Sequence, residues 1–141
     1  MTRWLLLLAL LLSSGRALAQ QGQHAAGDYT VHYNALPSAF LTPEIARQYG
    51  VLRSRVRGVL VVSVLRQGSP VRVRVEAQAG APGEPLQPLE LRLVETNGMP
   101  SYIGSFAIAS GESRQFRLRV EPPDDAPIHI GFTRQFFDDP P

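Results

Sequence analysis

Hydrophobic and polar residues alternate with a period of two along most of the chain from residue 28 onward, a pattern typical of half-buried β-strands. Residues 29–33, 71–76, 89–93, 115–120 and 128–133 each follow this alternation. Two further segments are short apolar runs: residues 57–65 are rich in Val, as in a strand buried on both faces, and residues 102–107 are bounded by turn residues. About seven strands at this spacing predict an all-β fold, a single immunoglobulin-like β-sandwich over residues 28–137.

One helical signal interrupts the strands between residues 42 and 50. Thr42 can cap a helix, Pro43 suits its first position, and Glu44 is favourable near its positive N-terminal end. Gly50 can take the left-handed conformation that commonly ends a helix. The sequence therefore predicts one short helix after the first strand, of two turns at most, which packing must hold in place.

The first 19 residues have the layout of a secretory signal peptide, in which Arg3 precedes the apolar run Trp4–Leu12 and small residues follow. This run covers less than half of the roughly 30 Å hydrocarbon core of a membrane at about 1.5 Å per residue. We therefore expect cleavage between Ala19 and Gln20, export to the periplasm, and no transmembrane span after cleavage. Residues 20–27 are expected to form a flexible leader, and residues 138–141 a short tail.

The chain contains 14 basic residues, all of them arginine, against 12 acidic residues, which gives a formal net charge of +2. Arg3 and Arg16 fall within the expected signal peptide, so the rest of the chain is formally neutral. Neutrality argues against nucleic acid as a partner, because binding to phosphates needs an excess of positive charge on one face. The absence of cysteine excludes disulfides, a thiolate nucleophile and a cysteine metal site.

The residues that could support catalysis or metal binding are few. His24, His32 and His129 are the imidazole bases, and no serine lies in a nucleophile-elbow pattern, so we expect a non-enzymatic protein without a cofactor. His32 and His129 could meet if the first and last strands pair. Two ligands are too few for a tight metal site, and no metal is expected.

Arginines recur two positions apart in three places, at residues 53/55/57, 72/74 and 117/119. In an extended chain each set points to one side, where it could grip a carboxylate or a phosphate. The alternative is a solvated outer sheet face on which arginines pair with Glu76, Glu90, Glu95 and Glu121 and protect the sheet from other chains. Both interpretations remain open at this stage.

Several segments together resemble a bacterial family, the domain of unknown function numbered 4426. Its opening signature is matched by residues 27–35, 40–44, 49–50 and 53–54, and further matches lie at residues 63–65, 102–106 and 132–137. The chain departs from the expected pattern at Val61, where members often carry Asn. The resemblance implies a small exported protein that forms one domain, and it assigns no catalytic residue.

The sequence therefore favours a non-enzymatic periplasmic binding or protein-interaction module that meets a periplasmic protein or a small ligand. The expected contact region surrounds the short helix and comprises His32, Tyr33, Asn34, Tyr49, Arg53 and Tyr102. Two alternatives remain open: a carrier of a small ligand or metal built on His32 and Arg53, and a small hydrolase-type enzyme with His32 or His129 in a deep pocket.

Overall fold

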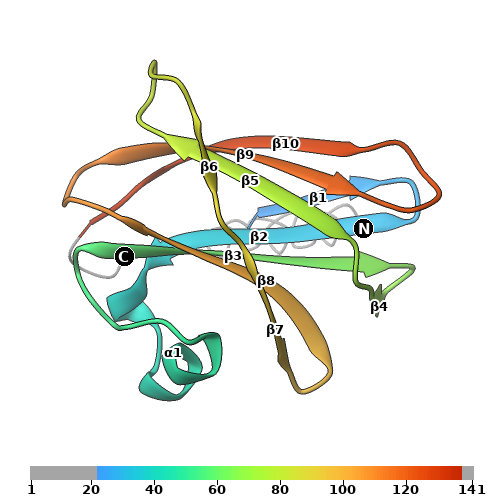
Figure 1. Cartoon of the computed structure of the whole chain (residues 1–141), viewed down its shortest axis with the longest axis horizontal. Coiled ribbons are helices and arrows are strands. Elements are labelled where there is room, and N and C mark those ends of the chain that lie inside the picture. The colour runs from blue at the N-terminus through green and yellow to red at the C-terminus, as the bar shows by residue number, and fades with distance from the viewer. Residues whose placement is uncertain (1–21, 138–141) are drawn as a thin grey trace, which may run out of the picture.

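The computed structural model describes residues 22–137, which form two antiparallel sheets packed face to face (Figure 1). The first sheet contains β1 (Gly22–Ala26), β2 (Tyr29–Pro37), β3 (Arg57–Arg66), β4 (Ser69–Pro70), β7 (Arg92–Thr96) and β8 (Met99–Ala107). The second contains β5 (Arg74–Gly80), β6 (Gln87–Leu89), β9 (Ser113–Glu121) and β10 (Ile128–Gln135). The predicted β-sandwich is confirmed.

The main core lies between the two sheets and is built from the alternating positions that the sequence indicated. Val31, Leu60 and Val62 from the first sheet meet Phe116 and Leu118 from the second, and each is almost fully buried. Aromatic rings pack together in one part of this core, where the Phe116 ring stacks on the Phe132 ring with centroids 4.9 Å apart. A core of this extent accounts for a stable domain without disulfides.

A second, smaller apolar cluster lies on the outer face of the first sheet, beneath the short helix α1 (Pro43–Tyr49) and the 3-10 turn η1 (Ser38–Phe40). Ala46 of the helix packs there with Val59 and Ile103. The predicted caps are confirmed: the Thr42 hydroxyl accepts a hydrogen bond from the Ile45 amide at 3.2 Å, and Gly50 ends the helix with φ of 69°. Because β3 is covered on both faces, its continuous apolar run is explained.

The structure differs from the sequence prediction at the N-terminal end, where residues 22–26 of the expected flexible leader form the edge strand β1. This strand pairs with β2 from Gly22 opposite Tyr33 to Ala26 opposite Tyr29. Its small, polar residues gave no hydrophobic run, but backbone hydrogen bonds to a neighbouring strand do not need one. The predicted signal peptide, Gln20, Gln21 and the tail lie outside the described residues.

The segment predicted as one strand at residues 89–93 is in fact divided between the two sheets. Gln87–Leu89 pairs with β5, whereas Arg92–Thr96 pairs with β8, so the chain crosses the edge of the sandwich at residues 90 and 91. The alternation continues through the crossing, which explains why the sequence did not reveal it. In Figure 1 this segment runs from β6 down to β7, in front of the strands behind it.

No helix within residues 22–137 is long and apolar enough to cross a membrane.

Candidate functional site

The three residues predicted on the first strand do not share one face of the sheet. Val31 and Ala35 of β2 point into the main core, and Tyr33 lies on that side with its ring 4.6 Å from the ring of Phe132. His32 and Asn34 occupy the alternate positions and therefore lie on the outer face. The structure thus separates Tyr33 from its two sequence neighbours.

Tyr102, Tyr49 and Arg53 are also held in separate surroundings. Tyr102 is a core residue whose hydroxyl accepts a hydrogen bond from the Val73 amide at 2.9 Å and donates one to the Val73 carbonyl. Tyr49 packs half-buried in the cluster beneath the helix. Arg53 is exposed, and its Nη2 donates to the Ala39 carbonyl at 3.1 Å. The six predicted residues therefore do not form one pocket, although Tyr49 and Arg53 flank the same loop.

The arginine rows behave in two different ways. On and beside the second sheet, three of the four arginines in these rows are paired: Arg72 with Glu95, Arg74 with Glu76 and Glu121, and Arg119 with Glu121. The fourth, Arg117, makes no ion pair with any residue from 22 to 137. This is the solvated face that the sequence offered as one alternative. Arg53, Arg55 and Arg57 instead make no ion pair with any carboxylate among residues 22–137.

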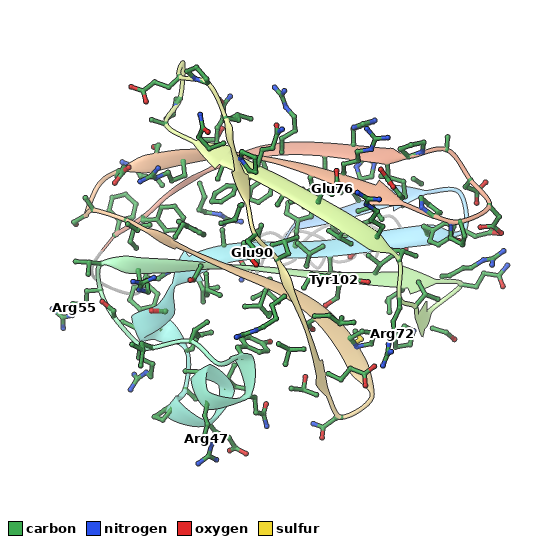
Figure 2. The ribbon with its side chains drawn as sticks, in the orientation of Figure 1. Arg47, Arg55, Arg72, Glu76, Glu90 and Tyr102 are labelled. Atoms are coloured by element: carbon green, nitrogen blue, oxygen red, sulfur yellow. The ribbon has the colours of Figure 1, made fainter. Side chains whose placement is uncertain are left out.

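The segment that carries these three arginines also exposes large apolar side chains. Leu52 is 79% exposed and Val56 is 67% exposed, in an irregular loop between the helix and β3. We refer to the exposed side chains of Arg47, Leu52, Arg53, Arg55, Val56 and Arg57 as the loop patch. Figure 2 shows Arg47 and Arg55 projecting away from the ribbon, Arg47 from the helix and Arg55 from the loop.

Ser38 holds this loop in position from below. It is buried, and its Oγ donates to the Leu52 carbonyl at 2.7 Å and accepts from the Ser54 amide at 2.9 Å. A backbone bond from Ala39 to the Ser54 carbonyl adds to this attachment. Sequence reasoning missed Ser38, because a lone serine after a proline carries no signal of its buried contacts. The loop is therefore exposed in its side chains but fixed in its backbone.

A groove of about 430 Å³ lies beside the loop patch on the outer face of the first sheet. Its walls come from the end of the helix and from the crossing segment, and its floor from β8: Gly50, Val51, Glu90, Leu91, Arg92, Ile103 and Ser105. Arg92 spans it by donating to the Tyr49 carbonyl. The groove and the loop patch therefore form one continuous feature around the helix, which we take as the candidate binding surface.

The histidines are arranged differently from the sequence-based expectation. His32 pairs in register with Gln23 and Ser63 of the first sheet, while β10, which carries His129, belongs to the second sheet. His24 of β1 instead lines a cavity of about 350 Å³ together with His129. Within residues 22–137 no three His, Cys, Asp or Glu side chains are grouped closely enough to hold a metal ion.

The sequence profile of a family described as a domain of unknown function, DUF4426, matches residues 23–139. The chain belongs to this family. A DUF4426 family protein from Pseudomonas aeruginosa PAO1, known from its crystal structure, is 30% identical and superimposes with a TM-score of 0.74 over 87% of this chain and 99% of that chain. The family resemblance inferred from the sequence is confirmed.

A more distant structural neighbour of the DUF4426 chain is a copper-bound variant of FetP from uropathogenic Escherichia coli strain F11. It is 11% identical, with a TM-score of 0.58 over 82% of this chain and 94% of that chain. At this identity the likeness concerns the fold alone. No curated protein matches the DUF4426 chain.

Proposed function

We propose that this chain is an exported, non-enzymatic binding module that uses the loop patch to contact an acidic surface of another periplasmic protein. The observation that carries the proposal is the exposure of Leu52 and Val56 between arginines that no carboxylate of the described chain neutralises. Exposed apolar side chains beside arginines are the composition of protein interfaces, in which Arg is enriched.

The charges around the loop argue for an acidic partner. Arg47, Arg53, Arg55 and Arg57 lie in one stretch of 11 residues that contains no Asp or Glu, and the nearest acid in sequence on its N-terminal side is Glu44. The remaining chain after the expected signal peptide is formally neutral, so the acids lie elsewhere and the loop patch is locally positive. A complementary negative surface would speed encounter and fix the orientation of the complex.

The fixed backbone of the loop supports binding rather than simple exposure. The Ser38 hydroxyl and the backbone bond from Ala39 hold the main chain of residues 52–54 before any partner arrives. A preordered loop loses less conformational entropy on association, which favours affinity. The loop patch therefore combines apolar area, positive charge and preorganisation.

The alternatives receive less support from the geometry. A metal carrier built on His32 and Arg53 would need further ligands near His32, and the residues of the described chain supply no group of three. The copper of the FetP variant belongs to a protein that shares only the fold. A hydrolase would need an imidazole paired with a nucleophile and an acid, and His24 and His129 share their cavity with Tyr29 and Asp125 but with no serine.

Cross-linking in the source bacterium, with the full-length chain, tests the proposal. We expect one acidic protein to be captured by the wild type and to be lost in Leu52→Ser/Val56→Ser and in Arg53→Glu/Arg55→Glu. Leu93→Ser is the matched control, because Leu93 is also an exposed large apolar residue, at 42%, but lies on β7. Equal capture by all variants, no capture, or capture of only a second copy of this chain would each refute the proposal.

Export is tested separately by the N-terminus of the mature protein. We expect the chain recovered from the periplasmic fraction to begin at Gln20, and Arg3→Glu in the positive region to reduce the amount exported. Recovery of a chain that still begins at Met1, in the cytoplasmic fraction alone, would contradict this part of the proposal.

A further inference from the structure

Two arginines point into the sandwich rather than out of it. On β9, Arg114 occupies the same alternating positions as the buried Phe116, Leu118 and Val120. On β10, Arg134 is likewise in phase with Phe132 and Ile130. Since side chains two apart in a strand share a face, both arginine side chains lie on the inner side of the second sheet, where each residue is half-buried.

The two arginines are direct neighbours across the strands. Arg134 lies opposite Arg114 in the register of β9 and β10, which places their Cβ atoms about 5 Å apart. Like charges directly opposite each other are destabilising, so this arrangement needs a compensating negative charge.

Only one of the two is compensated within the described chain. Arg114 pairs with Glu112 at 2.8 Å and donates to the Ala107 carbonyl at 3.0 Å. Arg134 forms no ion pair with any residue from 22 to 137. The Nε atoms of both arginines are buried and lack a hydrogen-bond acceptor there.

Burial lowers the pKa of Arg134, with Tyr33 as an opposing influence, because a cation loses hydration at this site without gaining an anion. A buried donor without an acceptor costs more free energy when it belongs to a charged group than when it belongs to a neutral group. Among residues 22–137, Arg134 is therefore a half-buried cation without an anion partner and with a buried Nε–H that donates to no acceptor.

We propose that Arg134 and Arg114 form an anion site, at this end of the sandwich, for a carboxylate or phosphate group. The guanidinium fork binds such groups through two parallel hydrogen bonds, and two adjacent forks can enclose one anion. The anion could belong to a free small molecule or to the chain's own Asp138 and Asp139, which follow Phe137 in sequence. This site is separate from the surface in the proposed function. The two lie at the same end of the sandwich, because Arg57 of the loop patch pairs in register with Ala107, whose carbonyl accepts the hydrogen bond from Arg114.

The direct readout is the NMR resonance of the arginine Nε–H groups during titration with inorganic phosphate and, separately, with succinate. We expect a saturable shift of the Arg134 resonance and a rise in melting temperature. Arg134→Gln should weaken binding by about tenfold or more, the loss of one charge-assisted hydrogen bond. Arg117→Gln is the matched control, because Arg117 lies on β9 but points outward and makes no ion pair within the described part of the chain.

Arg134→Gln should also fold at least as stably as the wild type in anion-free buffer, since it removes an uncompensated charge. The source of the anion is distinguished by Asp138→Asn/Asp139→Asn. Binding of phosphate or succinate by both the wild type and this variant supports a free ligand. Binding by the variant alone supports occupation by the chain's own carboxylates. If neither protein shows a saturable shift, or if Arg117→Gln weakens binding as much as Arg134→Gln, the anion site is refuted.

Discussion

Replacement of Ser38 by alanine tests whether the loop patch is held by hydrogen bonds from beneath. The Ser38 hydroxyl has one proton, which it donates to the Leu52 carbonyl at 2.7 Å, while it accepts from the Ser54 amide at 2.9 Å. The Ser54 carbonyl, at 3.2 Å, is a second possible acceptor for the same proton. Ser38→Ala therefore removes two simultaneous hydrogen bonds at a side chain that is only 1% exposed.

At about 1 kcal/mol for each bond, the variant should lose about 2 kcal/mol in free energy of unfolding, and about 3 kcal/mol if the Ser54 amide stays away from water. For a domain of this size the melting temperature should fall by on the order of 8 °C. Urea denaturation measures the free energy, and hydrogen exchange of the Ser54 amide, expected to rise by about tenfold or more, reports on the loop itself.

Ser63→Ala is the control for the loss of a serine hydroxyl, since Ser63 makes one contact with Ser101, at 3.3 Å between the Oγ atoms, far from the loop. It should cost about 1 kcal/mol or less and leave exchange at Ser54 unchanged. If Ser38→Ala unfolds within about 0.5 kcal/mol of the wild type and exchange in the loop is unaltered, the argument for a preordered loop patch is wrong.

Three further predictions concern the sandwich itself. Tyr102→Phe removes both hydrogen bonds to Val73 and should cost about 1–2 kcal/mol by urea denaturation; a loss as small as that of an exposed substitution would contradict this. Burial, followed by the hydrogen bond to Asp124, raises the pKa of Tyr29 above its ordinary value. The neutral phenol therefore contributes stability below about pH 10, and this stability is lost as the pH rises further. The urea midpoint of Tyr29→Phe should decline less between pH 9 and 11 than that of the wild type, and parallel curves would refute this expectation. Gly104→Ala places a methyl group 2.8 Å from the Leu91 side chain and 3.1 Å from the Glu90 carbonyl, at the crossing between the sheets, and should lower the free energy of unfolding by about 1–3 kcal/mol. Gly131→Ala is the control, because the nearest atom to its methyl group is 4.0 Å away, and it should cost little. Equal melting temperatures for the two variants would count against the crossing geometry.

The parts of the fold that were predicted correctly depend on short-range patterns. The Val-rich run at residues 57–65 is buried on both faces as expected, because the helix covers one face and the second sheet the other. The helix at residues 43–49 has the caps that Thr42 and Gly50 indicated. These features follow from the period of a strand and from the unpaired backbone groups at helix ends, both of which a sequence displays directly.

The parts that were missed depend on partners distant in sequence. The strand at Gly22–Ala26 exists because β2 offers an edge to it, and its own residues gave no hydrophobic pattern. The sequence contained a signal for the inward-pointing arginines. Arg114 lies one residue before the predicted strand 115–120 and Arg134 one residue after the predicted strand 128–133, and each continues the buried alternate positions of its strand. An arginine at a position where the alternation predicts a buried side chain was the feature that could have identified them.

The candidate binding surface shows the same division. The sequence alone indicated the three arginine rows but not which of them were neutralised, and it grouped Tyr102 with Arg53 although one is in the core and the other at the surface. Only the pairing of strands placed Glu76, Glu95 and Glu121 beside some arginines and left Arg53, Arg55 and Arg57 without a carboxylate partner in residues 22–137.

The sequence by itself determined that this protein is an all-β sandwich with one capped helix, because alternation and caps act over a few residues and need no distant partner. The tertiary structure alone decided where the chain crosses between sheets, which side chains are exposed in the loop patch, and which arginines have no carboxylate partner among residues 22–137. These properties depend on the register between strands far apart in sequence, and register brings charges and apolar groups together in combinations that no local pattern records.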